Sequence, residues 1–129
     1  MPEGTDRVER SVELDAPPEH VWDALVDPAL ASRWFGEEFT VEARPGGRVR
    51  VADDGDTRRG TVEVADPPRR LTLRVWERPV PGGPLHGSRI DFVIEPVDGR
   101  GSRLTVVEER LGSPRAGGRL AMATAGAVA

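Results

Sequence analysis

The sequence predicts an α+β domain built on one seven-stranded antiparallel sheet, with two short helices after the first strand. Two patterns of apolar residues indicate this class. Alternation with a period of two recurs in seven segments, so each predicted strand has one apolar and one polar face. Between the first two of these segments the apolar residues take helical spacing instead. Because a sheet with a single apolar face needs a second layer to cover it, we expect one compact domain over residues 1–129.

The first strand and the two helices follow from local signals near the N-terminus. Residues 6–14 alternate as a half-buried strand. A helix is expected to begin near Pro17, because proline is tolerated in the first turn, and to bury Trp22 in the core. Asp27 then ends this helix and caps a second, shorter one, which Gly36 stops.

Six further strands are expected after the helices, separated by turns rich in glycine, proline and aspartate. A longer loop is predicted over residues 79–87. After Gly112 only a short tail remains to cover the sheet, and residues 113–129 are expected to form a weak or truncated C-terminal helix because glycines interrupt it. The predicted strands contain residues 39–43, 49–51, 61–65, 71–76, 89–94 and 104–107.

The composition excludes several kinds of chemistry. The chain has no Cys, Lys, Tyr, Asn or Gln, and all 18 of its basic residues are Arg. Disulfides, iron–sulfur clusters and cysteine catalysis are therefore excluded, as are a lysine Schiff base and a tyrosine acid. With two His and no Cys, a structural zinc site is not expected, and we predict no metal and no cofactor.

The net charge of −4 is well mixed along the chain. Nucleic-acid binding needs a clustered basic surface, so DNA and RNA are not expected as partners. No apolar run approaches the ~18 residues of a membrane span, and the polar N-terminus lacks the pattern of a signal peptide. We therefore expect a cytoplasmic protein.

Several segments together resemble one known superfamily. They are APPEHVWDAL (16–25), DPAL (27–30), RWFG (33–36), PGGR (45–48), GTVEVADPPRRL (60–71) and GSRLTVVEE (101–109). Their order and spacing are similar to those of the START-like, or SRPBCC, superfamily. Within it, the chain most resembles the branch of heat-shock-protein ATPase activator homologues, the AHSA-type domains.

The resemblance implies a helix-grip fold. In that fold a curved seven-stranded antiparallel sheet wraps a long C-terminal helix, and a hydrophobic cavity lies between the two. The tail of this chain is shorter and more glycine-broken than the family's helix. Three alternatives follow from this departure: an unusually open cavity, a cavity covered by a partner chain such as a second copy, or a truncated chain.

The candidate ligand-binding residues are mostly apolar. Trp34 and Phe35 stand where the family's second helix forms part of the cavity rim, so the resemblance implies a contact with a flat or lipid-like ligand. Packing of the two rings in the core is the alternative. The apolar face of the predicted sheet supplies Phe39, Leu73 and Phe92 as further candidates.

Glu108 is the polar candidate. It follows Leu104 and Val106 on the predicted apolar face, where a carboxylate either pairs with an Arg or has a raised pKa. There it would orient a polar group of a ligand or act as a general base. The favoured alternative is that the strand ends here and the side chain reaches water. Trp76 is expected on the outer face by alternation, unless a bulge turns it inward.

The leading functional hypothesis is the binding of a hydrophobic small molecule in a cavity between the sheet and the C-terminal helix. A lipid, a polyketide or an antibiotic-like compound is the ligand class that the resemblance implies. Two alternatives remain: a co-chaperone-like interaction domain that stimulates a heat-shock ATPase, and a polyketide aromatase or cyclase. Catalysis is less favoured because the chain offers few polar groups for a cavity, and we assign no catalytic residue.

Overall fold

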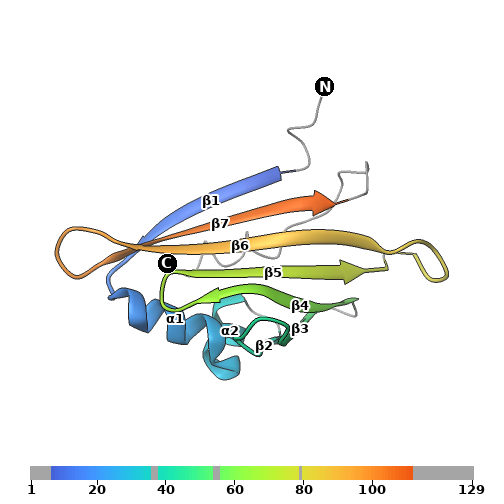
Figure 1. Ribbon diagram of the computed structural model, residues 1–129, viewed down its shortest axis with the longest axis horizontal. Helices are drawn as coiled ribbons and strands as arrows, with labels where there is room; N and C mark the ends of the chain where they lie inside the picture. Colours follow the sequence, from blue (N-terminus) through green and yellow to red (C-terminus); the bar gives the residue numbers. More distant parts are fainter. Residues whose placement is uncertain (1–6, 36–37, 54–55, 79, 112–129) are drawn as a thin grey trace.

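The computed structural model describes residues 7–35, 38–53, 56–78 and 80–111 (Figure 1). One seven-stranded sheet has the strand order β1-β7-β6-β5-β4-β3-β2, and every neighbouring pair is antiparallel. The predicted α+β class and number of strands are confirmed. The elements are β1 (Arg7–Leu14), α1 (Pro18–Val26), α2 (Pro28–Phe35), β2 (Glu38–Val41), β3 (Arg48–Asp53), β4 (Asp56–Asp66), β5 (Arg70–Glu77), β6 (His86–Pro96) and β7 (Ser102–Leu111).

The path of the chain brings its first and last strands side by side. Strands β2 to β7 follow one another as a meander, and β7 then pairs with β1 at the edge of the sheet. Both helices lie on the same side of the curved sheet, toward the end at which β1 finishes (Figure 1). There α1 packs against β6 and β7, and α2 packs against β2 and α1. This side is called the inward face below, and the opposite side the outer face.

Asp27 separates the two helices and serves both, as the sequence predicts. Its backbone N–H donates to the carbonyl oxygen of Asp23 at 2.9 Å and completes the last turn of α1, and its extended backbone (φ −84°, ψ 118°) ends that helix. Its Oδ1 accepts hydrogen bonds from the backbone N–H groups of Ala29 and Leu30, at 3.0 and 3.3 Å, and so caps α2. One residue therefore fixes the corner between the helices.

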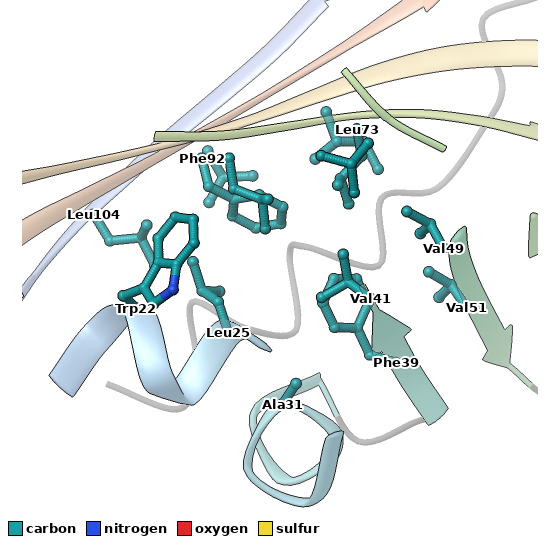
Figure 2. Close-up of a cluster of buried hydrophobic side chains, with 14 of the residues drawn as sticks. Trp22, Leu25, Ala31, Phe39, Val41, Val49, Val51, Leu73, Phe92 and Leu104 are labelled. Carbon is teal, nitrogen blue, oxygen red and sulfur yellow. The ribbon is translucent and has the colours of Figure 1, made fainter. Parts of the chain in front are cut away.

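The inward face holds the hydrophobic core. Trp22 and Leu25 from α1 point toward Phe92 from β6 and Leu104 from β7 (Figure 2). Trp22 is buried, which confirms its predicted place in the core. Each large apolar side chain buried in this way stabilises the fold by about 1.5–3 kcal/mol. The other buried members of the cluster are Val21, Ala31, Phe39, Val41, Val49, Val51, Val62, Leu71, Leu73, Val75, Ile90, Ile94 and Val106.

Two local features of β4 bend the sheet. A Cβ added at Gly60 would lie 1.8 Å from the carbonyl oxygen of Arg74 on β5, so only glycine permits this close approach. A shift of register between Val62 and Val64 marks a β-bulge in the same strand. Bulges increase the local twist and bend of the strand that carries them. The middle of the sheet therefore curls around the core.

Strands β6 and β7 extend further than the alternation of apolar residues predicts. β6 begins at His86, inside the predicted loop, and β7 continues to Leu111. Both strands are paired on both sides, so backbone hydrogen bonds extend them beyond the segments in which apolar residues alternate. Gly36 and the helix expected over 113–129 lie outside the described residues. Within the described part of the chain, no helix is long and apolar enough to cross a membrane.

Candidate ligand-binding site

The outer face of the sheet is a charged surface whose groups pair with one another. Arg70 donates two hydrogen bonds to Asp91, at 3.0 and 2.7 Å, and the Thr72 hydroxyl donates a third at 2.7 Å. Burial raises the pKa of Asp91, but these hydrogen bonds and the nearby arginine charges outweigh it and hold that pKa below its usual value. Asp91 is therefore ionised at neutral pH and ties β5 to β6.

Glu63 forms a second group on the outer face. It accepts hydrogen bonds from Arg74 Nε at 2.7 Å and Arg89 Nε at 3.1 Å. Partial burial raises the pKa of Glu63. The hydrogen bonds and charges of the two arginines have the larger, opposite effect, so the pKa of Glu63 lies below its usual value. Exposed pairs of this kind stabilise a fold only modestly. They link β4, β5 and β6 across the outer face and do not by themselves indicate a ligand.

Trp76 also lies on the outer face, as alternation predicts. Its backbone pairs with Arg59 and Gly87, and 38% of its surface is exposed. A Cβ added at Gly87 would lie 3.1 Å from the indole Nε1, so the ring covers the backbone of the neighbouring strand. The bulge of β4 lies nearer the other end of the strand and does not turn Trp76 inward.

The inward face near the helices is apolar. Phe39 and Phe92 meet edge to face, with ring centroids 6.3 Å apart and planes at 69°. Both rings and Leu73 are buried, so three of the predicted ligand-binding residues lie together in the core (Figure 2). Their contact with a ligand remains a prediction. Trp34 and Phe35 belong to the last turn of α2, but their side chains lie outside what the structure describes.

The inward face becomes polar at its other end. Residues directly opposite each other on paired strands lie on the same face of the sheet. The register therefore shows which polar side chains share the inward face with the buried apolar residues. On each of four neighbouring strands, the inward residues change from apolar to polar at the end where β5 and β7 finish and β6 begins (Figure 1). The residues of this polar end are Arg58 from β4 (which pairs with the buried Val51), Glu77 from β5, His86 and Ser88 from β6, and Glu108 and Arg110 from β7.

Glu108 and Arg58 form a buried ion pair in the polar end. Arg58 Nη1 lies 3.2 Å from Glu108 Oε2, and the two side chains are 11% and 4% exposed. Arg58 Nε is also 3.9 Å from Glu77, which is less buried. Because β5 and β6 lie between β4 and β7, the two strands would be about 14 Å apart in a flat sheet. The pair forms because the sheet curls and both side chains project inward.

The environment of Glu108 is unusual for a carboxylate. Burial raises its pKa above the usual value, although the charge and hydrogen bond of Arg58, the charge of Arg110 and the hydroxyl of Ser88 act in the opposite direction. Its Oε1 is buried and accepts no hydrogen bond of ordinary length from the described residues, although the Ser88 hydroxyl lies close enough to this carboxylate to lower its pKa. The ion pair therefore satisfies only one of the two carboxylate oxygens.

The favoured expectation that Glu108 reaches water is wrong. The strand does not end there, because β7 stays paired with both β1 and β6 beyond this residue. The alternatives of an Arg partner and a raised pKa are both correct. Arg58 and Glu77 were missed as site residues, although one signal was present: Arg58 is in phase with Gly60 and Val62 in the alternation of β4.

Within the described residues, no group of three or more His, Asp or Glu is arranged to hold a metal ion.

The curled seven-stranded sheet with two helices after the first strand defines a START-like, or SRPBCC, domain. Residues 15–126 match the family model described as "Activator of Hsp90 ATPase homolog 1-like protein", and the chain belongs to this family. None of the curated proteins matches the chain in sequence.

Solved structures show the same fold. CalU16 from Micromonospora echinospora is 29% identical with a TM-score of 0.64, over 84% of this chain and 62% of CalU16. DynU16, from the dynemicin biosynthetic locus, is 28% identical with a TM-score of 0.71, over 95% of this chain and 43% of DynU16. An HSP90 activator from Plasmodium falciparum, PFC0360w, is 16% identical with a TM-score of 0.67, over 84% and 76% of the two chains. That last identity supports a common fold only.

Proposed function

We propose that this chain binds an apolar small molecule against the inward face of its sheet, close to the polar end. One observation carries the proposal: a buried Arg58–Glu108 pair directly adjoins the apolar core. A buried ion pair usually stabilises a fold no better than apolar residues of the same volume. Ligand sites, in contrast, combine a mostly apolar lining with a few placed polar groups. The pair therefore fits a binding role better than a purely structural one.

One of the comparisons supports a small-molecule ligand. CalU16 and DynU16 share 29% and 28% of their aligned residues with this chain, and DynU16 belongs to a biosynthetic locus. The chain spans only 62% and 43% of those two proteins, so their own activities are not transferred to it. The predicted opposite wall of the site, residues 113–129, lies outside the described residues.

Methyl-resolved NMR tests the proposal with controls that the chain itself provides. We would screen hydrophobic metabolites by thermal shift and native mass spectrometry, and then titrate the hits into protein with labelled Ile and Val methyl groups. Ile90 and Val106 face inward, whereas Val93 and Val107 lie on the outer face of the same two strands. We expect saturable shifts at the inward methyls only. No hit in the screen, or shifts limited to the outer methyls, would contradict the proposal.

An interaction with a chaperone is the second candidate, and the family match is what favours it. The exposed Trp76 on the outer face offers a contact for such a partner. The test is the ATPase rate of the host organism's Hsp90 with and without this chain. Stimulation that Trp76→Ala abolishes would support the interaction, and an unchanged rate would end it.

A further inference from the structure

Oε1 of Glu108 is a buried polar atom that the described chain leaves without a hydrogen bond. Its companion Oε2 accepts from Arg58 at 3.2 Å, and the side chain is 4% exposed. A buried acceptor without a partner lowers the stability of the fold, and such atoms are rare in native proteins. A group from outside the described chain that donates to this oxygen would remove that loss of stability.

The surroundings of Oε1 define the chemistry of such a donor. Arg58 and Arg110 already place two positive charges near the carboxylate, so a third cation would be repelled by them. The Ser88 hydroxyl is the neutral donor that the described chain itself brings close to this carboxylate. Ile90 on β6 and Val8 on β1 lie directly opposite Glu108 on either side, and both are apolar. A neutral hydroxyl group carried on an apolar body satisfies both conditions. A ligand without a donor leaves Oε1 unsatisfied, and an anionic group would meet the carboxylate itself.

We infer that Oε1 of Glu108 accepts a hydrogen bond from a hydroxyl group of the bound ligand, while Ile90 and Val106 contact the apolar part of that ligand. The ligand class is thus an apolar alcohol or phenol, in place of a hydrocarbon, an ester or a fatty acid. This inference rests on the proposed small-molecule function and specifies its polar contact.

A matched pair of probes separates the inference from the proposed function. 2-Naphthol and 2-methoxynaphthalene have the same aromatic body, but only the naphthol donates a hydrogen bond. We would measure the dissociation constant of each for the wild-type chain by fluorescence and methyl NMR. Because a hydrogen bond to a charged group is among the stronger ones, the naphthol is expected to bind about tenfold more tightly or better.

Two neighbouring variants locate the effect. Glu108→Gln keeps the shape of the side chain but offers an amide in place of the second carboxylate oxygen, so the preference for naphthol is expected to fall to about twofold or less. Glu109→Gln is the matched control, because Glu109 follows in the same strand but lies on the outer face, 3.9 Å from Arg89. This variant should keep the full preference.

Each outcome decides between the two claims. If neither probe binds the wild-type chain, the proposed function fails and the inference fails with it. If both probes bind equally well, the proposed function stands but the inference is overturned, and a tightly held water on Oε1 would give this same result. If Glu108→Gln keeps the preference, the hydroxyl is recognised elsewhere and the inference is again overturned. The wild-type comparison is decisive even if a variant does not fold.

Discussion

Replacing Arg58 with Met should expose the cost of the buried carboxylate. Met keeps most of the length and apolar contact of the Arg stem but removes the charge that faces Glu108. At the observed 3.2 Å, Coulomb's law with an effective dielectric constant of about 20 gives an attraction of about 5 kcal/mol between two unit charges. Removing one partner of a buried pair typically costs about 3–5 kcal/mol. We therefore expect Arg58→Met to lose about 3–5 kcal/mol of unfolding free energy at pH 8.

This loss should shrink as the pH falls. The folded-state pKa of Glu108 is raised above its usual 4.5, so between these two values folding favours the protonated carboxyl and stability increases toward lower pH. Without Arg58 that pKa rises further, and each additional unit corresponds to about 1.4 kcal/mol. At pH 5 the deficit of Arg58→Met relative to wild type should be smaller by at least about 1 kcal/mol.

Urea unfolding of both proteins at pH 8 and pH 5 measures this difference. The protonation of side chains that both proteins share contributes equally to each and cancels. Arg59→Met is the matched control, because Arg59 is the next residue of β4 and lies on the exposed outer face. It should change stability by about 0.5 kcal/mol or less. In the double variant Arg58→Met/Glu108→Leu, most of the lost stability should return at both pH values. A deficit of Arg58→Met that equals that of Arg59→Met, or that does not depend on pH, would refute the reasoning.

Three further predictions concern the framework of the site. Gly60→Ala should lower stability by about 2 kcal/mol or more, because its Cβ would lie 1.8 Å from a backbone oxygen of β5. Gly46→Ala, whose Cβ meets open space at a φ of +82°, should cost only about 1 kcal/mol, and the reverse order in thermal unfolding would contradict the close approach. Phe92→Ala should cost about 3–5 kcal/mol against about 1 kcal/mol for Val93→Ala on the outer face, and equal losses in urea would count against the assigned core. Asp91→Asn should cost about 1–2 kcal/mol at pH 7. Because folding lowers the pKa of Asp91 from its usual 3.8, the ionised carboxylate stabilises the fold above pH 3.8 and this stabilisation is lost as the pH falls below that value. The deficit of Asp91→Asn should therefore shrink toward pH 3, and a deficit that stays constant would argue against the pairing.

Features that depend on neighbouring residues could be predicted from the sequence. Asp27 ends one helix with its extended backbone and caps the next through hydrogen bonds that span only a few residues. The alternation in β5 places Trp76 on the outer face and Leu73 in the core, because successive side chains of a strand point to opposite faces. Neither prediction needed knowledge of distant parts of the chain.

The candidate site could be predicted only in part. The sequence placed Glu108 on the apolar face, but the end of the apolar alternation at Val106 was a poor guide to where that strand ends. Its partner Arg58 is 50 residues away and belongs to a strand that is not adjacent in the sheet. Periodicity assigns each of these residues to a face, but it gives no distance between strands β4 and β7.

The order of amino acids alone determined the fold class, the two faces of the sheet and the residues available for chemistry, because periodicity and capping are local properties of the chain. The tertiary structure decided which inward polar residues meet and which carboxylate oxygen stays without a partner. The reason is the curl of the sheet: the close approach at Gly60, the bulge after Val62 and the twist of every strand together bring Arg58 to Glu108. This curvature builds up over several strands, so it is a property of the folded molecule and not of any single segment.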